Sequence, residues 1–146
     1  MKPDPAARNA RPVDHVARAL IVQALRGGEA VTFTARGGSM WPLLRDGATV
    51  RVDPSASRAL RPGELGCFAR GDVPVVHRVV ETSERGVTFA GDALGRGDGE
   101  VPWADVLGRA SVLAQPALRL RWPRAGESLR ALRALGRVAR ARWGAR

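Results

Sequence analysis

The chain has 146 residues, of which 45% are hydrophobic and 26% charged, so its length and composition predict one folded domain and exclude wholesale disorder. Its formal net charge of +10 points to an anionic partner such as nucleic acid, a lipid surface or an acidic protein. Because it has one cysteine and two histidines, we expect no disulfide framework, no metal and no cofactor.

The first predicted element is a short helix over residues 13–26, within an N-terminal segment of residues 1–30. Its apolar residues recur at helical spacing, and a pair of glycines ends it. No apolar stretch with a cleavage site precedes the helix, and the most apolar window, residues 19–25, is far shorter than the ~20 residues that cross a membrane. Without a signal peptide or a transmembrane helix, we expect a cytoplasmic protein.

Residues 31–116 predict a compact, mainly antiparallel β domain. Short segments in this range are rich in β-branched or aromatic residues. Turn signals separate these segments, and one of the turn signals is a glycine-rich loop over residues 95–99. The segments are residues 31–36, 48–52, 65–69, 73–80, 87–90 and 107–113. Short strands at this spacing are typical of compact antiparallel β domains.

The C-terminal segment, residues 117–146, carries most of the positive charge. It holds nine arginines and one acid, Glu127, for a net charge of +8, whereas residues 1–116 amount to +2. Residues 124–143 return to helical periodicity, with leucine, alanine and tryptophan on one stripe and arginines elsewhere, which predicts an amphipathic helix. Such a helix can pack on the β domain, lie on an anionic membrane or contact nucleic acid.

Three segments carry the residue types of a hydrolytic site. Ser39 follows two glycines and precedes a proline-containing turn, where a serine can be exposed beside free backbone N–H groups. His77 belongs to a polar pair inside an apolar strand, and Asp92 and Asp98 come at the end of a strand and in the loop after it. Each feature alone is more often a turn or a structural hydrogen bond. Their order on a β scaffold favours nucleophilic catalysis.

Five motifs in chain order resemble those of the signal peptidase and LexA-type serine peptidases. They are Ser39-Met40-Trp41-Pro42 followed by Asp46-Gly47, Leu60 to Glu64, His77-Arg78, Gly91-Asp92 with Asp98 beyond it, and Leu107-Gly108-Arg109. The resemblance covers roughly residues 31–114. It implies the antiparallel β domain of that family and an endopeptidase that cleaves a protein or peptide precursor.

The resemblance also implies a role for each site residue, with Ser39 as the nucleophile. Most bacterial members use a Ser-Lys dyad, but the one lysine here is Lys2, and arginine stays protonated and cannot act as a base. His77 is therefore the expected general base, as in the Ser-His-Asp branch of endoplasmic-reticulum and archaeal signal peptidases. Asp98 is expected to orient His77 and fix its tautomer. Asp92 is expected to tie down the loop or to share that role.

The oxyanion and substrate contacts are expected next to Ser39. Backbone N–H groups at Ser39 and Met40 would stabilise the oxyanion, and Gly38 lets the backbone approach a bound peptide. Trp41 is expected either in the core or against the substrate. Many relatives carry a serine at the position of Gly37, and the loss of one such oxyanion donor can cost about 100-fold in rate.

Two other functions stay open. A noncatalytic member of this fold would bind an anionic partner through the arginine-rich tail. A LexA-like self-cleaving regulator is disfavoured, because about 30 residues precede the β domain, too few for the usual DNA-binding domain and cleavable linker. Because the family acts at membranes, residues 124–146 are expected to make peripheral contact with an anionic membrane, at its inner face, rather than with nucleic acid.

Overall fold

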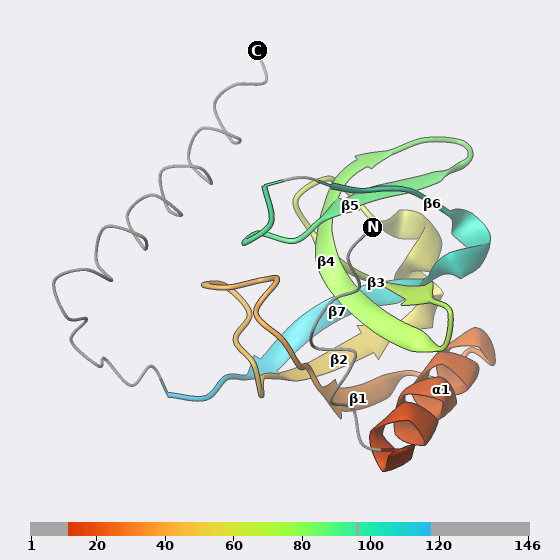
Figure 1. The fold of residues 1–146 in the computed structure, drawn as a ribbon. Coiled ribbons are helices and arrows are strands. Elements are labelled where there is room, and N and C mark those ends of the chain that lie inside the picture. The colour runs from red at the N-terminus through yellow and green to blue at the C-terminus, as the bar shows by residue number, and fades with distance from the viewer. Residues whose placement is uncertain (1–11, 96, 118–146) are drawn as a thin grey trace, which may run out of the picture.

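The computed structural model describes residues 12–95 and 97–117, which form a helix and a seven-stranded antiparallel sheet (Figure 1). In chain order the elements are α1 (Pro12–Arg26), β1 (Val31–Thr34), β2 (Thr49–Asp53), η2 (Pro54–Ala59), β3 (Leu65–Arg70), β4 (Val73–Thr82), β5 (Gly86–Ala90), β6 (Gly97–Pro102), η3 (Trp103–Asp105) and β7 (Val106–Ala114), where η marks a short 3-10 helix. The sheet order is β1-β2-β7-β3-β4-β5-β6. The predicted short helix and mainly antiparallel β architecture are confirmed.

The predicted loop over residues 95–99 is wrong in part, because β6 begins inside it. This strand pairs with β5 in antiparallel register, with Val87 opposite Val101. Glycine and aspartate are poor strand formers, so residues 97–99 carry no strand signal and the pairing with β5 decides their conformation. Asp98 therefore lies on an edge strand of the sheet and not in a loop.

The predicted amphipathic helix over residues 124–143 lies outside the described residues. The contact of residues 124–146 with an anionic membrane therefore stays a prediction. Among the helices of residues 12–95 and 97–117, none combines the length and the apolar character needed to cross a membrane.

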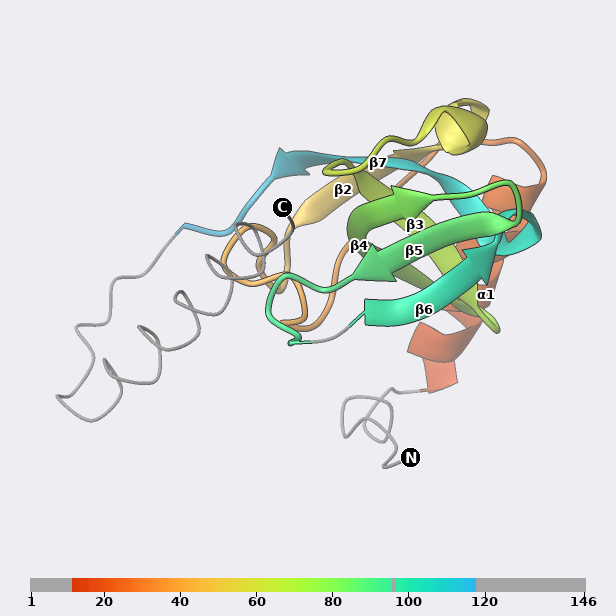
Figure 2. The same cartoon turned by 90° about the horizontal axis from the view of Figure 1, so that it is seen from above.

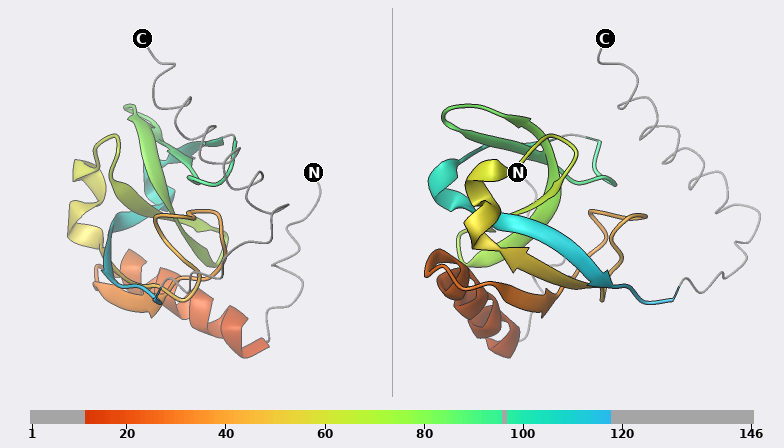
Figure 3. Two further views of the ribbon diagram at one scale, coloured as in Figure 1. Left: turned by 90° about the vertical axis from the view of Figure 1, so that its left-hand side faces the viewer. Right: turned by 180° about the vertical axis from the view of Figure 1, so that it is seen from behind.

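The helix α1 shares a hydrophobic core with the sheet. Its residues Val22 and Leu25 lie three positions apart on one helix face and are buried with Val50 and Val52 of β2. Figure 3 shows the helix lying against the sheet close to β1. The helical part of the predicted N-terminal segment thus belongs to the same folded unit as the β domain.

A second buried cluster lies where β3, β4 and β5 curve around each other, and Figure 2 shows these strands side by side. Phe68 of β3 and Phe89 of β5 stack with their ring centroids 4.7 Å apart, although β4 lies between the two strands in the sheet. Phe68 also sets its ring against the edge of His77, at 5.9 Å between centroids. The cluster therefore supports the residue that the sequence predicts as a base.

A substitution at Gly66 tests how tightly this cluster is packed. Gly66 pairs with His77 across β3 and β4, and a Cβ there would lie 2.7 Å from the Cε1 atom of the fully buried Phe89. We expect Gly66→Ala to lower the free energy of unfolding by about 1–3 kcal/mol, because overpacking a dense core forces side chains off their preferred rotamers. Urea titration followed by tryptophan fluorescence measures the change.

The matched control is Gly95→Ala, because a Cβ at Gly95 meets no atom within 4 Å. This variant should unfold at the same urea concentration as the parent protein. Equal stability of the two variants would contradict the packing described for Phe89.

Candidate active site

The nucleophile loop, residues 37–47, connects β1 to β2 and carries Ser39. It begins at Gly37 with φ of +97°, a conformation that favours glycine, and the N–H of Gly37 donates to the Asp46 carboxylate at 2.8 Å. Met40 anchors the loop, because its side chain is buried in the first core cluster. The position of Ser39 is therefore fixed by the Gly37–Asp46 hydrogen bond on one side and by the buried side chain of Met40 on the other.

His77 lies in the middle of β4 and is buried, with 3% of its surface exposed. Its Nε2 atom lies 2.9 Å from the Oγ atom of Ser39. Strand alternation turns the His77 ring toward the face that holds Phe68, where the aromatic contact fixes its orientation. The structure thus brings the predicted nucleophile and base within hydrogen-bond reach.

Asp98 contacts the other nitrogen of the same ring. Its Oδ2 atom lies 2.5 Å from Nδ1 of His77, and its side chain is almost fully buried. When Nδ1 donates its proton to this carboxylate, Nε2 is left as the acceptor for the hydroxyl of Ser39. In Figure 1 the nucleophile loop and the segment that leads into β6 come together beside β4. Ser39 thus contacts His77, and His77 contacts Asp98, which is how a nucleophile, a base and an orienting acid are arranged.

Asp92 contacts Arg78 and not His77. Its two carboxylate oxygens accept hydrogen bonds from Nε and Nη2 of Arg78, both at 2.7 Å. This bidentate pairing raises the pKa of Arg78 above its ordinary value. Of the two roles expected for Asp92, the geometry matches the tying down of the loop.

The loop after β5 docks onto the nucleophile loop through its backbone. The N–H of Ala93 donates to the carbonyl oxygen of Ser39 at 2.8 Å. A Cβ at Gly91 would lie 2.8 Å from the same oxygen, so this close approach requires glycine. The two residues of the predicted Gly-Asp motif therefore have different structural roles. Gly91 leaves room for the Ser39 carbonyl oxygen, and Asp92 anchors the loop to β4 through Arg78.

Free backbone donors lie beside the serine hydroxyl. The N–H groups of Ser39 and Met40 donate no hydrogen bond to any described residue. Such donors beside a nucleophile are the components of an oxyanion hole. The Met40 side chain points into the core, so its backbone alone can serve the site. Gly38 is exposed and leaves open space next to Ser39.

Exposed apolar side chains flank Ser39 in the loops that meet there. Trp41 and Leu43 of the nucleophile loop are 41% and 47% exposed, and Leu94 of the loop after β5 is 49% exposed. Trp41 therefore lies outside the core, and its contact with a substrate stays a prediction.

Sequence reasoning missed Arg70, at the end of β3. Its Nη2 atom donates to the Oδ1 atom of Asp98 at 2.8 Å, and its guanidinium carbon lies 5.6 Å from the ring centroid of Phe68. Arg70 is one of 23 arginines and belongs to no motif, so nothing local distinguishes it. Only folding brings it to Asp98, which lies on a strand that does not pair with β3.

The sequence also gave no sign of the contacts that hold the nucleophile loop from outside. Gln115, just after β7, accepts a hydrogen bond from the N–H of Arg45 at 3.1 Å and donates to the carbonyl of Leu43 at 2.7 Å. The Arg45 side chain donates to the carbonyl of Pro116 at 2.7 Å. The seen-from-behind view in Figure 3 shows β7 ending beside this loop.

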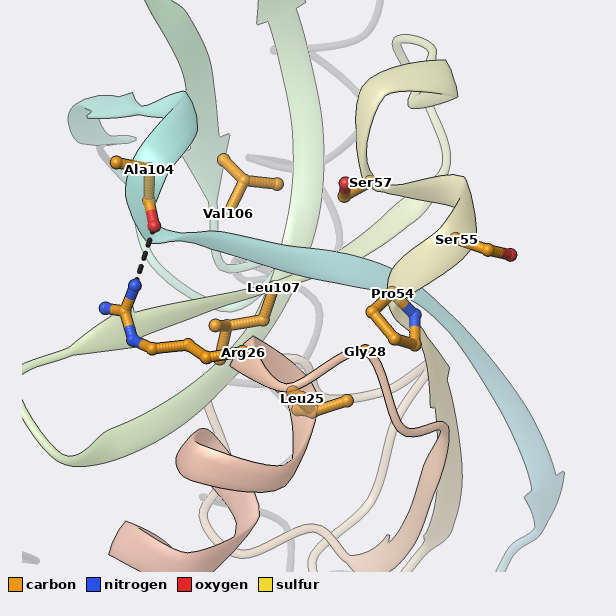
Figure 4. A pocket seen from close by; sticks show the side chains of 9 residues that line it. All are labelled: Leu25, Arg26, Gly28, Pro54, Ser55, Ser57, Ala104, Val106 and Leu107. Carbon is orange, nitrogen blue, oxygen red and sulfur yellow. Dashed lines mark hydrogen bonds between the residues drawn. The ribbon is translucent and has the colours of Figure 1, made fainter.

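A hollow of about 520 Å³ lies apart from these residues, between the end of α1, η2 and the start of β7 (Figure 4). Its lining residues are Leu25, Arg26, Gly28, Pro54, Ser55, Ser57, Ala104, Val106 and Leu107. The Arg26 side chain crosses one side and donates to the carbonyl of Ala104 at 2.7 Å. Because Ser39, His77 and Asp98 do not line it, the hollow is not the place of their chemistry.

Two residues of reactive type have no contact with the candidate site. His15 is exposed on α1, and Cys67 is buried on β3. Within residues 12–95 and 97–117, no group of three or more histidine, cysteine, aspartate or glutamate side chains could hold a metal ion.

Comparison of the chain with known protein families and with curated proteins finds no match to either. A function for the protein therefore has to be argued from the contacts of Ser39, His77 and Asp98 and from the motif order in the sequence.

Burial raises the pKa of the Cys67 thiol from 9.0 to about 12. Because the thiolate is the reactive form, we expect the native protein to resist iodoacetamide at pH 8, whereas the protein in urea reacts fully. Intact mass spectrometry measures both. Since the folded pKa is the higher one, the stability contributed by this thiol is complete below about pH 9 and is lost as the pH rises toward 12. Equal alkylation of native and unfolded protein would rule out this burial.

Proposed function

We propose that this protein is a serine endopeptidase of the signal-peptidase type, which cleaves a protein or peptide precursor. The observation that carries the proposal is the hydrogen-bonded chain from Ser39 through His77 to Asp98, with contacts of 2.9 and 2.5 Å. The buried imidazole has a hydrogen-bond partner on each nitrogen, as the general base of a serine hydrolase requires.

The finer fold, a signal-peptidase or LexA-like β domain, is part of this proposal. It is supported by the structural roles of three of the five sequence motifs. Ser39 stands in the loop after β1, and His77 stands on β4. The Gly91-Asp92 pair docks the next loop against both.

In the first half-reaction, the Oγ atom of Ser39 attacks the carbonyl carbon of the scissile peptide bond while Nε2 of His77 takes the hydroxyl proton. Asp98 stabilises the imidazolium that forms. The developing oxyanion accepts hydrogen bonds from the free N–H groups of Ser39 and Met40. His77 then gives the proton to the leaving amine, the C–N bond breaks, and an ester remains on Ser39.

In the second half-reaction, water gives a proton to His77 and attacks the ester carbon. The C–O bond to Ser39 breaks, and the proton returns from His77 to the Ser39 oxygen as the acid product leaves. Gly37 offers no hydroxyl to the oxyanion, so stabilisation comes from backbone N–H groups alone. The absence of one donor slows such an enzyme by about 100-fold or more.

β4 gives an extended peptide a place to pair beside the base. β3 pairs with β4 along residues 73–78, whereas β5 joins β4 only from Arg78 onward. Within the described chain, the part of β4 that precedes His77 therefore has a strand partner on one side alone. A peptide added as a strand there would carry its backbone past Ser39. The exposed ring of Trp41 would then contact its side chains.

Alanine at Ser39 or His77 tests the proposal directly. We expect each variant to lose cleavage by about 10⁴-fold or more while the urea unfolding midpoint stays close to that of the parent protein. The assay is incubation with a peptide library derived from a whole proteome, followed by mass spectrometry of the new N-termini. Cleavage at the same sites by both variants would defeat the proposal.

A fluorophosphonate probe gives a readout that does not depend on the natural substrate. We expect one adduct per chain in the parent protein, on Ser39, and none in Ser39→Ala. A parent protein that takes no adduct and cleaves no library peptide is not this enzyme. Salt-dependent binding of an anionic partner by the arginine-rich tail would then be the function to test.

The two aspartates allow orientation of the base to be separated from anchoring of the loop. Asp98→Asn should lower kcat/KM by about 10⁴-fold, because an amide does not hold the productive histidine tautomer. Asp92→Asn should keep most of the activity but lower the urea midpoint, because Arg78 loses its bidentate partner. Equal losses of kcat/KM in the two variants would show that these roles are assigned wrongly.

A further inference from the structure

Arg70 contacts the site but has no part in the reaction steps above. It donates to the Oδ1 atom of Asp98 at 2.8 Å, while the Oδ2 atom of the same carboxylate contacts His77. The Asp98 side chain is 10% exposed and that of Arg70 is 60% exposed. One carboxylate is thus shared between a buried imidazole and a guanidinium at the surface.

The fold holds Arg70 from two sides. Strand alternation on β3 places it on the same face as Phe68, where its guanidinium carbon lies 5.6 Å from the ring centroid. Phe68 in turn contacts the His77 ring. Because β6 pairs with β5 and not with β3, the Arg70–Asp98 contact bridges two strands that share no backbone hydrogen bond.

We propose that Arg70 is a positioning residue that acts on His77 through Asp98, an inference that rests on the proposed peptidase function. The hydrogen bond from its Nη2 atom to Oδ1 holds the carboxylate in the orientation in which Oδ2 faces Nδ1 of His77. Its positive charge offsets part of the negative charge of Asp98, which limits how strongly Asp98 stabilises the imidazolium. Removal of the Arg70 charge would therefore strengthen the interaction between Asp98 and the imidazolium.

The other charged groups near His77 compensate each other. Arg78 is the next residue on β4, so its side chain points to the opposite face, and Asp92 neutralises it in a bidentate pair. Ser39, on the Nε2 side, is uncharged. Among the described residues, removal of the Arg70 charge therefore leaves Asp98 as the uncompensated charge that faces His77.

The test removes the charge of Arg70 and keeps a hydrogen-bond donor, through Arg70→Gln in the full chain. NMR follows the ring protons of His77 as the pH is changed, and the exposed His15 provides the second signal of this type. We expect the midpoint of the His77 titration to rise by about half a pH unit or more in Arg70→Gln. Arg70→Lys, which keeps the charge, should restore a midpoint close to that of the parent.

The matched control is Arg85→Gln. Arg85 pairs with Glu100, another acid of β6, at 3.2 Å, so this variant removes the same charge from a similar pair that contacts neither His77 nor Asp98. It should leave the midpoint unchanged. A midpoint in Arg70→Gln that equals that of Arg85→Gln, or lies below it, overturns the proposal.

Activity gives a second readout of the same effect. The acid limb of the pH profile for fluorophosphonate labelling should move to higher pH in Arg70→Gln, and a shift of half a pH unit makes labelling on that limb about threefold slower. If Ser39 is not an activated nucleophile, no variant is labelled at any pH. The NMR titration still decides the role of Arg70 in that case, so the two failures are distinguishable.

Discussion

A histidine buried in an apolar strand needs a hydrogen-bond partner on each ring nitrogen, and this need governs the structure around His77. A buried polar group left without a partner costs about 1–3 kcal/mol. The chain supplies one partner from the loop after β1 and the other from the edge strand β6. The docking of Ala93 on the Ser39 carbonyl and the packing of Phe68 on the imidazole ring follow from the same arrangement. The contacts that satisfy the buried imidazole are therefore the same contacts on which the proposed catalysis depends.

Much of the fold could be read from local patterns. The helix ending at Arg26 and the strands with apolar alternation carry their own periodicity, so their positions were predictable within a few residues. β6 was not predictable, because residues 97–99 have no strand propensity and take their conformation from β5. The strand order, with β7 between β2 and β3, depends on packing between distant segments and has no local signal.

In the candidate site, too, some features could be predicted from local sequence and others depend on contacts between distant segments. Ser39, His77 and the two aspartates stand in short patterns that chemistry makes recognisable, so the sequence could single them out. Which aspartate faces the histidine depends on the register and curvature of β6, which no local pattern shows. Arg70 is invisible in sequence for a related reason: it reaches Asp98 across strands that do not pair.

Asp98 belongs to the outermost strand of the sheet, which β5 alone holds by backbone pairing. Such edge segments open at a lower free energy than the whole protein unfolds. Opening of the first residues of β6, ahead of the buried Val101, would carry the acid away while Ser39 and His77 keep their places. In the proposed peptidase, the protein in that state would be folded and catalytically silent. The pairing equilibrium of one edge strand would then set an upper limit on the turnover of the proposed peptidase, and changes far from Ser39 would alter it by changing how long that strand stays paired.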